Sequence, residues 1–338
     1  MPKVSLVIPA YNIESYIRRC IESVKNQTFT DFEAIVIDDA STDNTHAVLV
    51  EAIGDDTRFR LVRHEKNRGL HLARRSAAAL VSGEYVFCLD GDDELAPDFL
   101  QQVVGRMDEH PVDMLHVGIT VIPENGVTPQ EAEGFAAYIN RPTMPLNDAD
   151  ILRMIYDEAN GQPLDWRATQ RLYRASLFKA AFERMTDEVL ERAEDAYEVF
   201  VLAALSETAD GFEACRGYIS HYGIGVTGTS KISMDTFGRF CKQFAACIQK
   251  TEEFVQEHGA TAELQSAYCG MVHKLLELLA NDWLVRVDPA EQEEALKPFA
   301  AAFNDAVVAR ELYRFVRDIA YEAIASEKEL PQDSDAHR

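Results

Sequence analysis

The sequence predicts an α/β fold in roughly its first two thirds and an all-helical region after it. Apolar runs and amphipathic segments alternate about every thirty residues up to residue 105, the pattern of a parallel sheet with helices on both faces. From about residue 106 the alternation is less regular, and from Met234 to Ser326 the apolar spacing is helical. Several carboxylates directly follow predicted strands, at the sheet edge where ligands bind.

The first half of the chain contains four predicted strands of the buried type, over residues 3–8, 33–37, 59–63 and 85–89. Asn12 is expected to cap the helix after the first strand, whose apolar stripe is Ile17, Cys20, Ile21 and Val24. Ser41 or Thr42 is expected to cap the second helix, and Gly54 to close it. A third helix is predicted over residues 70–81.

The second half begins with a predicted strand over residues 113–122 and a polar loop over 123–147, and shorter elements follow to about 230. A helix around LERAEDAYEVFVLAAL is predicted from the apolar stripe Val189, Ala193, Ala196, Val199 and Phe200. Near the C-terminus, Asp288 to Glu291 have the pattern of an N-cap, a proline at the first helical position and a capping-box glutamate.

Composition excludes several classes of protein. The formal net charge of -24 over 338 residues argues against a general binder of nucleic acid or anionic lipid, because the surface repels polyanions. The six cysteines show no metal-ligand spacing and mostly lie in apolar runs, so we expect reduced core thiols in a cytoplasmic protein. No apolar run approaches the length of a membrane-spanning helix.

The stretch YVFCLDGDDEL, residues 85–95, leads an apolar strand into a cluster of acids. Two unit charges about 4 Å apart repel by roughly 1 kcal/mol in water and about 4 kcal/mol at an effective dielectric of about 20. The turn is therefore either solvated, since Asp and Gly are ordinary turn residues, or completed by a cation. Because Asp38, Asp39, Asp90 and Asp92 all fall at the carboxyl ends of predicted strands, the cation is favoured.

Five segments of the chain, in order, resemble the inverting family 2 glycosyltransferases of the GT-A fold, many of which build bacterial surface polysaccharides. The segments are VSLVIPAYN, QTFTDFEAIVIDDASTDNT, NRGLHLARRSAA, GEYVFCLDGDD and AEDAYEVF. The resemblance covers residues 3 to about 230. It implies a GT-A mixed sheet flanked by helices, and sugar transfer from a nucleoside-diphosphate sugar, expected to be a UDP-sugar, to a glycan, lipid-linked or protein acceptor.

The same resemblance implies roles for matching positions. Tyr11 would stack on the base, Asp39 would hydrogen-bond the uracil ring, and Arg74 would lie near the diphosphate. Asp90, near the ribose, and Asp92 match a pair that holds Mn²⁺ or Mg²⁺. Asp195 matches the general base, with Glu194 beside it. The nucleotide-binding positions are Pro9, Ala10, Tyr11, Asn12, Glu14, Asp38, Asp39, Asn67, Gly69, Arg74, Asp90 and Gly91.

Some residues depart from the family pattern or have open roles. Arg68, Arg75 and Arg171 stand where relatives often have Gly, Asn and Lys, and the arginine often found after Tyr222 is absent, which bears on sugar and acceptor contacts. Asp93 and Glu94 are expected to be solvated acids before Pro97, without a role. His71 and His116 are expected to be packing or surface residues. His221 is a candidate third metal ligand, and Trp166 and Tyr173 suit either an acceptor platform or the core.

The chain is expected to divide into a nucleotide-sugar-binding half (1–105), an acceptor-binding half carrying the base (106–232), a helical region (233–327) and a disordered tail (328–338). The helices allow a homodimer, and their acidic polar faces limit membrane association to a peripheral one at the inner membrane. The alternative function is a catalytically silent GT-A scaffold that binds a partner. The joint presence of Asp39, Asp92 and Asp195 argues against such decay.

Overall fold

The computed structural model describes residues 1–156, 165–224, 231–304 and 306–316. These residues form two compact units. The first contains the described chain up to Ile224 together with Ala246–Met271, and the second contains 231–245 and the described residues from Val272 onward. Within the described parts of the chain, no helix is long and apolar enough to cross a membrane.

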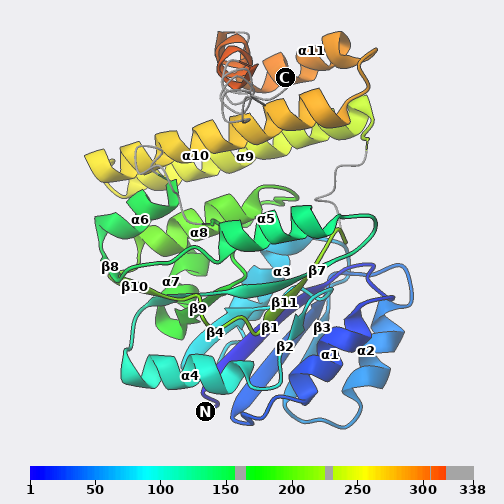
Figure 1. Ribbon diagram of the computed structural model, residues 1–338, viewed down its shortest axis with the longest axis vertical. Coiled ribbons are helices and arrows are strands. Elements are labelled where there is room, and N and C mark those ends of the chain that lie inside the picture. The colour runs from blue at the N-terminus through cyan, green and yellow to red at the C-terminus, as the bar shows by residue number, and fades with distance from the viewer. Residues whose placement is uncertain (157–164, 225–230, 305, 317–338) are drawn as a thin grey trace, which may run out of the picture. The chain divides into compact units, whose positions relative to one another are not determined.

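The first half of the chain alternates strand and helix, as predicted. The central strands β1, β2, β3 and β4 are parallel, and β1 lies between β2 and β4 (Figure 1). The predicted strands and the third helix are confirmed to within a few residues. The bounds are β1 Val4–Ala10, α1 Ile17–Lys25, β2 Phe32–Asp38, α2 Thr45–Ile53, β3 Phe59–Arg63, α3 Gly69–Ala78 and β4 Tyr85–Cys88.

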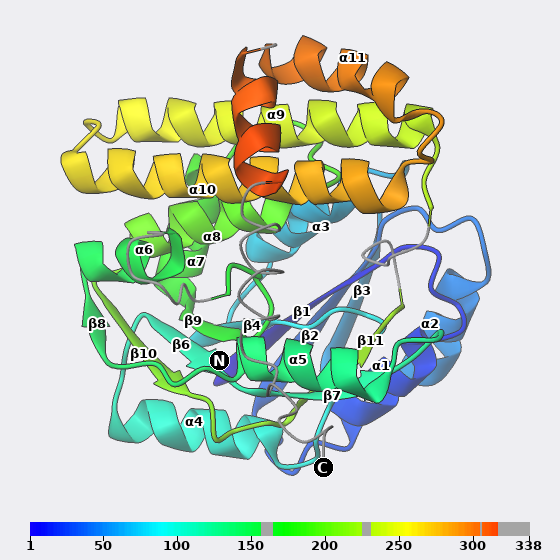
Figure 2. The same cartoon turned by 45° about the horizontal axis from the view of Figure 1, so that its top comes forward.

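Helices cover both faces of this sheet, which explains why its central strands are apolar throughout. Every residue of β1 is buried. Leu6 and Ile8 share one core with Ile21 of α1, while α3 contacts β1 and β2 from the other face (Figures 1 and 2). The register pairs Ala10 of β1 with Asp38 of β2, so the loops after both strands emerge at one edge.

The second half turns the sheet into a mixed one, because β9 runs antiparallel to both β4 and β6. The strand order is β3-β2-β1-β4-β9-β6-β10-β8, and a second small sheet has the order β5-β11-β7. The bounds are β5 Glu94–Leu95, α4 Phe99–Glu109, β6 Met114–Val117, β7 Ile119–Pro123, α5 Pro129–Ile139, β8 Leu146–Asn147, α6 Ala149–Tyr156, β9 Arg171–Arg174, α7 Ala175–Arg184, α8 Glu194–Ala204, β10 Thr208–Phe212 and β11 Tyr218–Tyr222.

Two predictions for this half were wrong. The strand expected over 113–122 is two strands in different sheets, β6 and β7, and the break falls at Gly118, where an added Cβ would lie 2.3 Å from the carbonyl oxygen of Glu213. The loop expected over 123–147 contains α5, which starts with a complete capping box between Thr128 and Glu131. That capping signal was present in the sequence.

The predicted helix caps also need correction. Helix α1 begins at Ile17 rather than next to Asn12, whose side-chain oxygen instead accepts a hydrogen bond from the Thr42 amide at 2.8 Å. Asn44, not Ser41 or Thr42, is the cap residue of α2. The two loops bind each other across the sheet edge, so their polar side chains serve a long-range contact that local patterns do not reveal. Gly54 closes α2, as expected, with φ of 58°.

The C-terminal region is helical where the structure describes it, with α9 Met234–Glu257, α10 Ala262–Asn281, the π-helical turn η2 Asp282–Arg286 and α11 Gln292–Phe303. Residues 288–291 form a turn before α11, with Glu291 at its cap, so the expected start at Asp288 was early. The carboxylate of Asp288 accepts from the Ala290 amide at 2.9 Å, which stabilises the turn instead.

The second half of α9 belongs to the same unit as α8. Phe254 is 3% exposed, and its ring meets that of Phe200 edge to face, with centroids 6.2 Å apart. Lys250 pairs with Glu188 at 2.7 Å, and the Cys247 thiol donates to the Arg192 carbonyl at 3.3 Å. The segment that leads into α8 is therefore packed from outside by α9.

We predict that Phe254→Ala lowers the free energy of unfolding by about 3 to 5 kcal/mol, because it removes a buried ring and leaves a cavity against Phe200. Urea denaturation measures the effect. Leu278→Ala, at a position 43% exposed, serves as the control and should cost less than about 1 kcal/mol. Equal costs for the two variants would contradict the packing described for α9.

Candidate functional site

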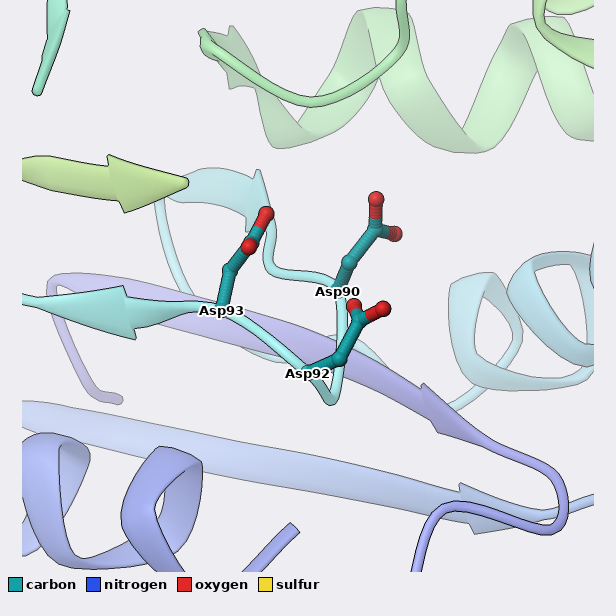
Figure 3. A group of neighbouring side chains, drawn as sticks. All are labelled: Asp90, Asp92 and Asp93. Carbon is teal, nitrogen blue, oxygen red and sulfur yellow. The ribbon is translucent and has the colours of Figure 1, made fainter. Parts of the chain in front are cut away.

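An acidic turn follows β4. Figure 3 shows Asp90, Asp92 and Asp93 projecting from this turn, and one carboxylate oxygen of each lies within 4.8 Å of the others. Gly91 permits the turn, because a Cβ there would come within 2.5 Å of the Ile13 side chain and 3.0 Å of the Pro9 carbonyl oxygen. Three clustered carboxylates provide the oxygen ligands that hard divalent cations prefer.

The expectation that Asp93 and Glu94 are solvated was wrong for Asp93, whereas the Glu94 side chain is 29% exposed. Asp93 is buried and accepts hydrogen bonds from the Tyr218 hydroxyl at 2.6 Å and the His221 amide at 2.8 Å. Glu94 lies 2.7 Å from Nε2 of His221, and Glu124 lies 3.0 Å from Nδ1 of the same ring. The acidic turn is thereby fastened to β11, and both ring nitrogens of His221 face carboxylates.

Burial dominates the electrostatics of this turn. It raises the pKa of Asp93 to about 6, with a further contribution from Asp92, although Tyr218 and His221 act in the opposite direction. Burial also raises the pKa of Asp90 and of Asp92, and Arg74 opposes the rise at Asp90. The Asp90 side chain is 37% exposed, so water moderates the effect there. Charges that raise one another's pKa in this way are stabilised by a bound cation.

A second pair of acids lies in the first turn of α8. Ala193, just before the helix, has φ of 65°, a left-handed conformation that is uncommon for alanine. Glu194 is 8% exposed, and burial together with Asp195 raises its pKa to about 8. The Asp195 side chain is 27% exposed and so remains accessible. Burial raises the pKa of Asp195, and Arg74 opposes the rise.

Arg74 of α3 joins the two acidic groups. It is fully buried, and its Nη1 donates to Asp195 at 2.5 Å and to Glu198 at 2.9 Å, while Nη2 lies 3.5 Å from Asp90. The structure thus brings Asp90 of the predicted metal pair and the predicted base Asp195 to one guanidinium. Arg74 therefore contacts both the turn after β4 and the start of α8.

Glu198 was not singled out in the sequence, whereas His71, expected to be a packing or surface residue, is a packing residue whose ring stacks on that of Phe182. Both are fully buried, and the His71 Nδ1 lies 2.8 Å from Glu198. The sequence did contain a signal that groups His71 with Arg74 and Glu198 with Asp195. His71 and Arg74 are three residues apart on one helix, as are Asp195 and Glu198 on another, so each pair shares a helix face.

The loop after β1 carries the remaining N-terminal candidates. Pro9 and Ala10 end β1, and Tyr11 is 45% exposed, so it is accessible for stacking on a planar ligand. Glu14 accepts from the Asn44 amide at 2.8 Å, so it contributes to the contact between the two loops. Asp38 is buried and accepts from the Ser41 amide, with His46 and Arg63 beside its other oxygen.

Asp39 has more contacts than expected for a ligand-binding acid. It is 3% exposed and accepts from the amides of Arg68 and Gly69, at 2.7 Å for Gly69, and its Oδ1 lies 2.6 Å from Nδ1 of His64. It therefore anchors the start of α3, where Gly69 has φ of 81°. Asn67 lies beside it, with its side-chain amide 3.4 Å from the Asp39 carbonyl oxygen. A hydrogen bond from Asp39 to a base stays a prediction.

The other residues singled out in the sequence have structural contacts. Tyr173 is in the core, and its hydroxyl donates to the Ala168 carbonyl. Arg171 is buried and donates to the carbonyls of Arg167 and Asp165. Arg75 donates to the carbonyls of Phe182 and Met185, and His116 is buried with its Nε2 near the Ile139 carbonyl. The departures at Arg75 and Arg171 thus serve packing of the second half of the unit.

We predict that the metal-free protein loses stability as pH rises from about 5 to about 9. The native pKa values of Asp93, about 6, and Glu194, about 8, lie above those of unfolded carboxyls. The native state therefore holds protons that the unfolded chain has released, and this contribution disappears as pH passes through the native values. Thermal unfolding in EDTA across this range measures it. Glu194→Gln should flatten the upper part of the curve, and unchanged steepness would contradict the assignment.

Comparisons with known proteins agree on the family. The family model described as Glycosyl transferase family 2 matches residues 5–182. A Bacillus subtilis protein, EpsH, described as a glycosyltransferase, is 26% identical over 324 residues, covering 90% of this chain and 88% of EpsH. Chondroitin synthase of Escherichia coli is 45% identical over 101 residues, covering 30% of this chain and 15% of the synthase.

Solved structures show the same fold. S. aureus TarS 1-349 in complex with UDP superimposes with a TM-score of 0.59 at 21% identity, covering 90% of this chain and 82% of that one. The mannosyltransferase PcManGT of Pyrobaculum calidifontis, in complex with GDP-Man and Mn²⁺, superimposes with a TM-score of 0.55 at 17% identity. This match covers 96% of this chain and 82% of that one. The fold is therefore GT-A, with helices added at its C-terminal end. With a family match over more than half of its length, this chain belongs to the family 2 glycosyltransferases.

Proposed function

We propose that the protein transfers a sugar, with inversion, from a UDP-sugar to a hydroxyl of a glycan, lipid-linked or protein acceptor. The observation that carries the proposal is the pairing of Arg74 with Asp195 on one side and Asp90 on the other. An acid suited to deprotonating an acceptor and an acid suited to a diphosphate-bound cation thereby flank one site. Single displacement needs both and needs no nucleophilic side chain.

Asp90 and Asp92 would hold the divalent cation, Mn²⁺ or Mg²⁺. The fit rests on their oxygen atoms, their closeness, and a burial that raises their pKa values. Asp93 is the third member of the cluster, but its carboxylate already accepts two hydrogen bonds. When bound, the cation supplies positive charge that offsets the charge developing on the leaving diphosphate. The Mn²⁺ complex of PcManGT supports this choice of cation class.

Asp195 is the proposed general base. In the reaction, the acceptor oxygen forms a bond to the anomeric carbon, the bond from that carbon to the diphosphate oxygen breaks, and the hydroxyl proton passes to Asp195. The nucleoside diphosphate leaves with the bonding electrons. Asp195 is accessible, unlike the buried Glu194 and Glu198, so it is the carboxylate of this group that can reach an acceptor.

The UDP assignment rests on Tyr11, whose exposed ring can stack on a base, and on Asp39. TarS structures with UDP and with UDP-GlcNAc support it, whereas PcManGT binds GDP-Man. A donor screen by thermal shift, with and without Mn²⁺, tests the proposal, together with release of free nucleoside diphosphate. Larger stabilisation by GDP or dTDP than by UDP would contradict the UDP assignment. No release from any donor would contradict the reaction.

Polysaccharide assembly is the proposed setting, supported by relatives such as the chondroitin synthase of E. coli. The protein would work in the bacterial cytoplasm, at most peripherally at the inner membrane. Its first 105 residues would bind the nucleotide-sugar, residues 106–232 the acceptor, and the helical region from 233 would support the fold or form a homodimer.

We predict that Asp92→Asn abolishes Mn²⁺-dependent UDP binding while the fold remains intact, because removing one charge from the cluster relieves repulsion. Calorimetric titration of UDP with and without Mn²⁺ measures it. Asp98→Asn removes a nearby exposed charge and should bind UDP like the wild type. Metal-dependent binding that survives in Asp92→Asn would refute the metal assignment.

For Asp195→Asn we predict a fall in turnover of about 100-fold or more, with donor affinity within about twofold of the wild type, because the amide keeps the shape but cannot accept the proton. Nucleoside diphosphate release and donor titration give the two numbers. Asp187→Asn, at an exposed position before α8, is the matched control. Parallel losses of binding and turnover would instead make Asp195 a donor-contact residue.

A further inference from the structure

We propose that Glu198 and His71 are positioning residues for the transfer reaction, because they form with Arg74 a buried chain of charges that holds Arg74 against Asp195. This inference rests on the proposed function of Asp195. Glu198 and His71 are fully buried, so they touch neither substrate nor solvent. They come from α3 and α8, the two helices on which the site depends.

The buried series of charged side chains begins at His71, whose two ring nitrogens both face acceptors. Nε2 lies 2.9 Å from the carbonyl oxygen of Thr186, and a carbonyl can only accept, so Nε2 carries a hydrogen. Nδ1 lies 2.8 Å from Glu198, which also receives a hydrogen bond from Arg74. Because both ring nitrogens face oxygen acceptors, His71 is assigned as a donor from both, which makes it the cationic end of this series.

Glu198 then determines how the guanidinium of Arg74 is oriented. One Glu198 oxygen accepts from His71 and the other accepts from Nη1 of Arg74. The same Nη1 donates to Asp195, so its two hydrogens are divided between a buried support and the proposed base. Nη2 is left on the side of Asp90. Without Glu198 the guanidinium would lose the contact that fixes its orientation.

The charges alternate in sign along this series, from His71 through Glu198 and Arg74 to Asp195. Removing the charge of Glu198 and removing that of His71 should therefore have opposite effects on the proton affinity of Asp195. Removing the Glu198 charge leaves Arg74 to stabilise the Asp195 anion alone, which weakens the base. Removing the His71 charge lets Glu198 neutralise Arg74 more fully, which increases the proton affinity of Asp195. Among the residues that the structure describes, the charged or titratable groups that interact electrostatically with Asp195 include Arg74, Asp90, Arg167, Glu194, Glu198, Cys88, Cys247, Tyr156 and Tyr173.

The test is the pH profile of kcat for nucleoside diphosphate release in Glu198→Gln and His71→Gln. We expect Glu198→Gln to lower kcat by about tenfold and to shift the acid limb to lower pH by roughly half a unit or more. His71→Gln should shift the same limb to higher pH. Donor affinity should stay within about twofold in both. Glu188→Gln, which removes an exposed charge paired with Lys250, is the control and should keep the wild-type profile.

Shifts in the same direction, or rate losses without shifts, would overturn the inference, because a merely structural role has no reason to move the limb in opposite directions. If Glu198→Gln fails to fold, the sign of the shift in His71→Gln decides alone. Asp195→Asn separates the two proposals. Wild-type turnover in that variant would refute the base itself, whereas an inactive Asp195→Asn beside an unshifted Glu198→Gln would refute only the positioning role.

Discussion

The buried guanidinium of Arg74 is the constraint on which the site depends. A buried guanidinium needs acceptors for its hydrogens, and those of Arg74 are the carboxylates of Asp195, Glu198 and Asp90. These partners come from α8 and from the turn after β4, which are far apart in the sequence. Satisfying one arginine therefore places an acid of the proposed metal site and the proposed base at fixed positions, and it ties the second half of the unit to the first.

The sheet edge supplies the other half of the geometry. Because β1, β2 and β4 are parallel, their following loops emerge together, and each carries polar residues that bind a neighbouring loop. Asp93 also links neighbouring segments, because its hydrogen bonds with Tyr218 and the His221 amide fix the acidic turn to β11. Each acid proposed to meet a ligand thus has a neighbouring acid, Asp93 or Glu198, whose charge is used within the protein. The site therefore contains more carboxylates than the proposed ligands need, because some of them serve only contacts within the protein.

The sequence predicted what depends on local pattern and missed what depends on distant partners. The central strands are apolar because both sheet faces are covered, so they were identified closely. Gly118 looked like a strand residue because Glu213, whose carbonyl oxygen leaves no room for a Cβ at this position, is far away in the sequence. Asn12 and Asp93 looked like a cap and a surface acid because their partners are distant in the sequence, in the loop after β2 and in β11. The spacing that puts His71 beside Arg74 and Glu198 beside Asp195 is present in the sequence, but only tertiary packing sets these two helix faces against each other.

Direct displacement at the anomeric carbon has a stereochemical consequence that can be observed without knowing the acceptor. Proton NMR of the sugar released from an α-linked UDP-sugar to water, at high protein concentration with Mn²⁺, reports the configuration of the first product. Asp195 acting as base without a covalent intermediate predicts that the β anomer forms first and that Asp195→Asn forms none. Initial formation of the α anomer would contradict single displacement, and with it the role of Asp195.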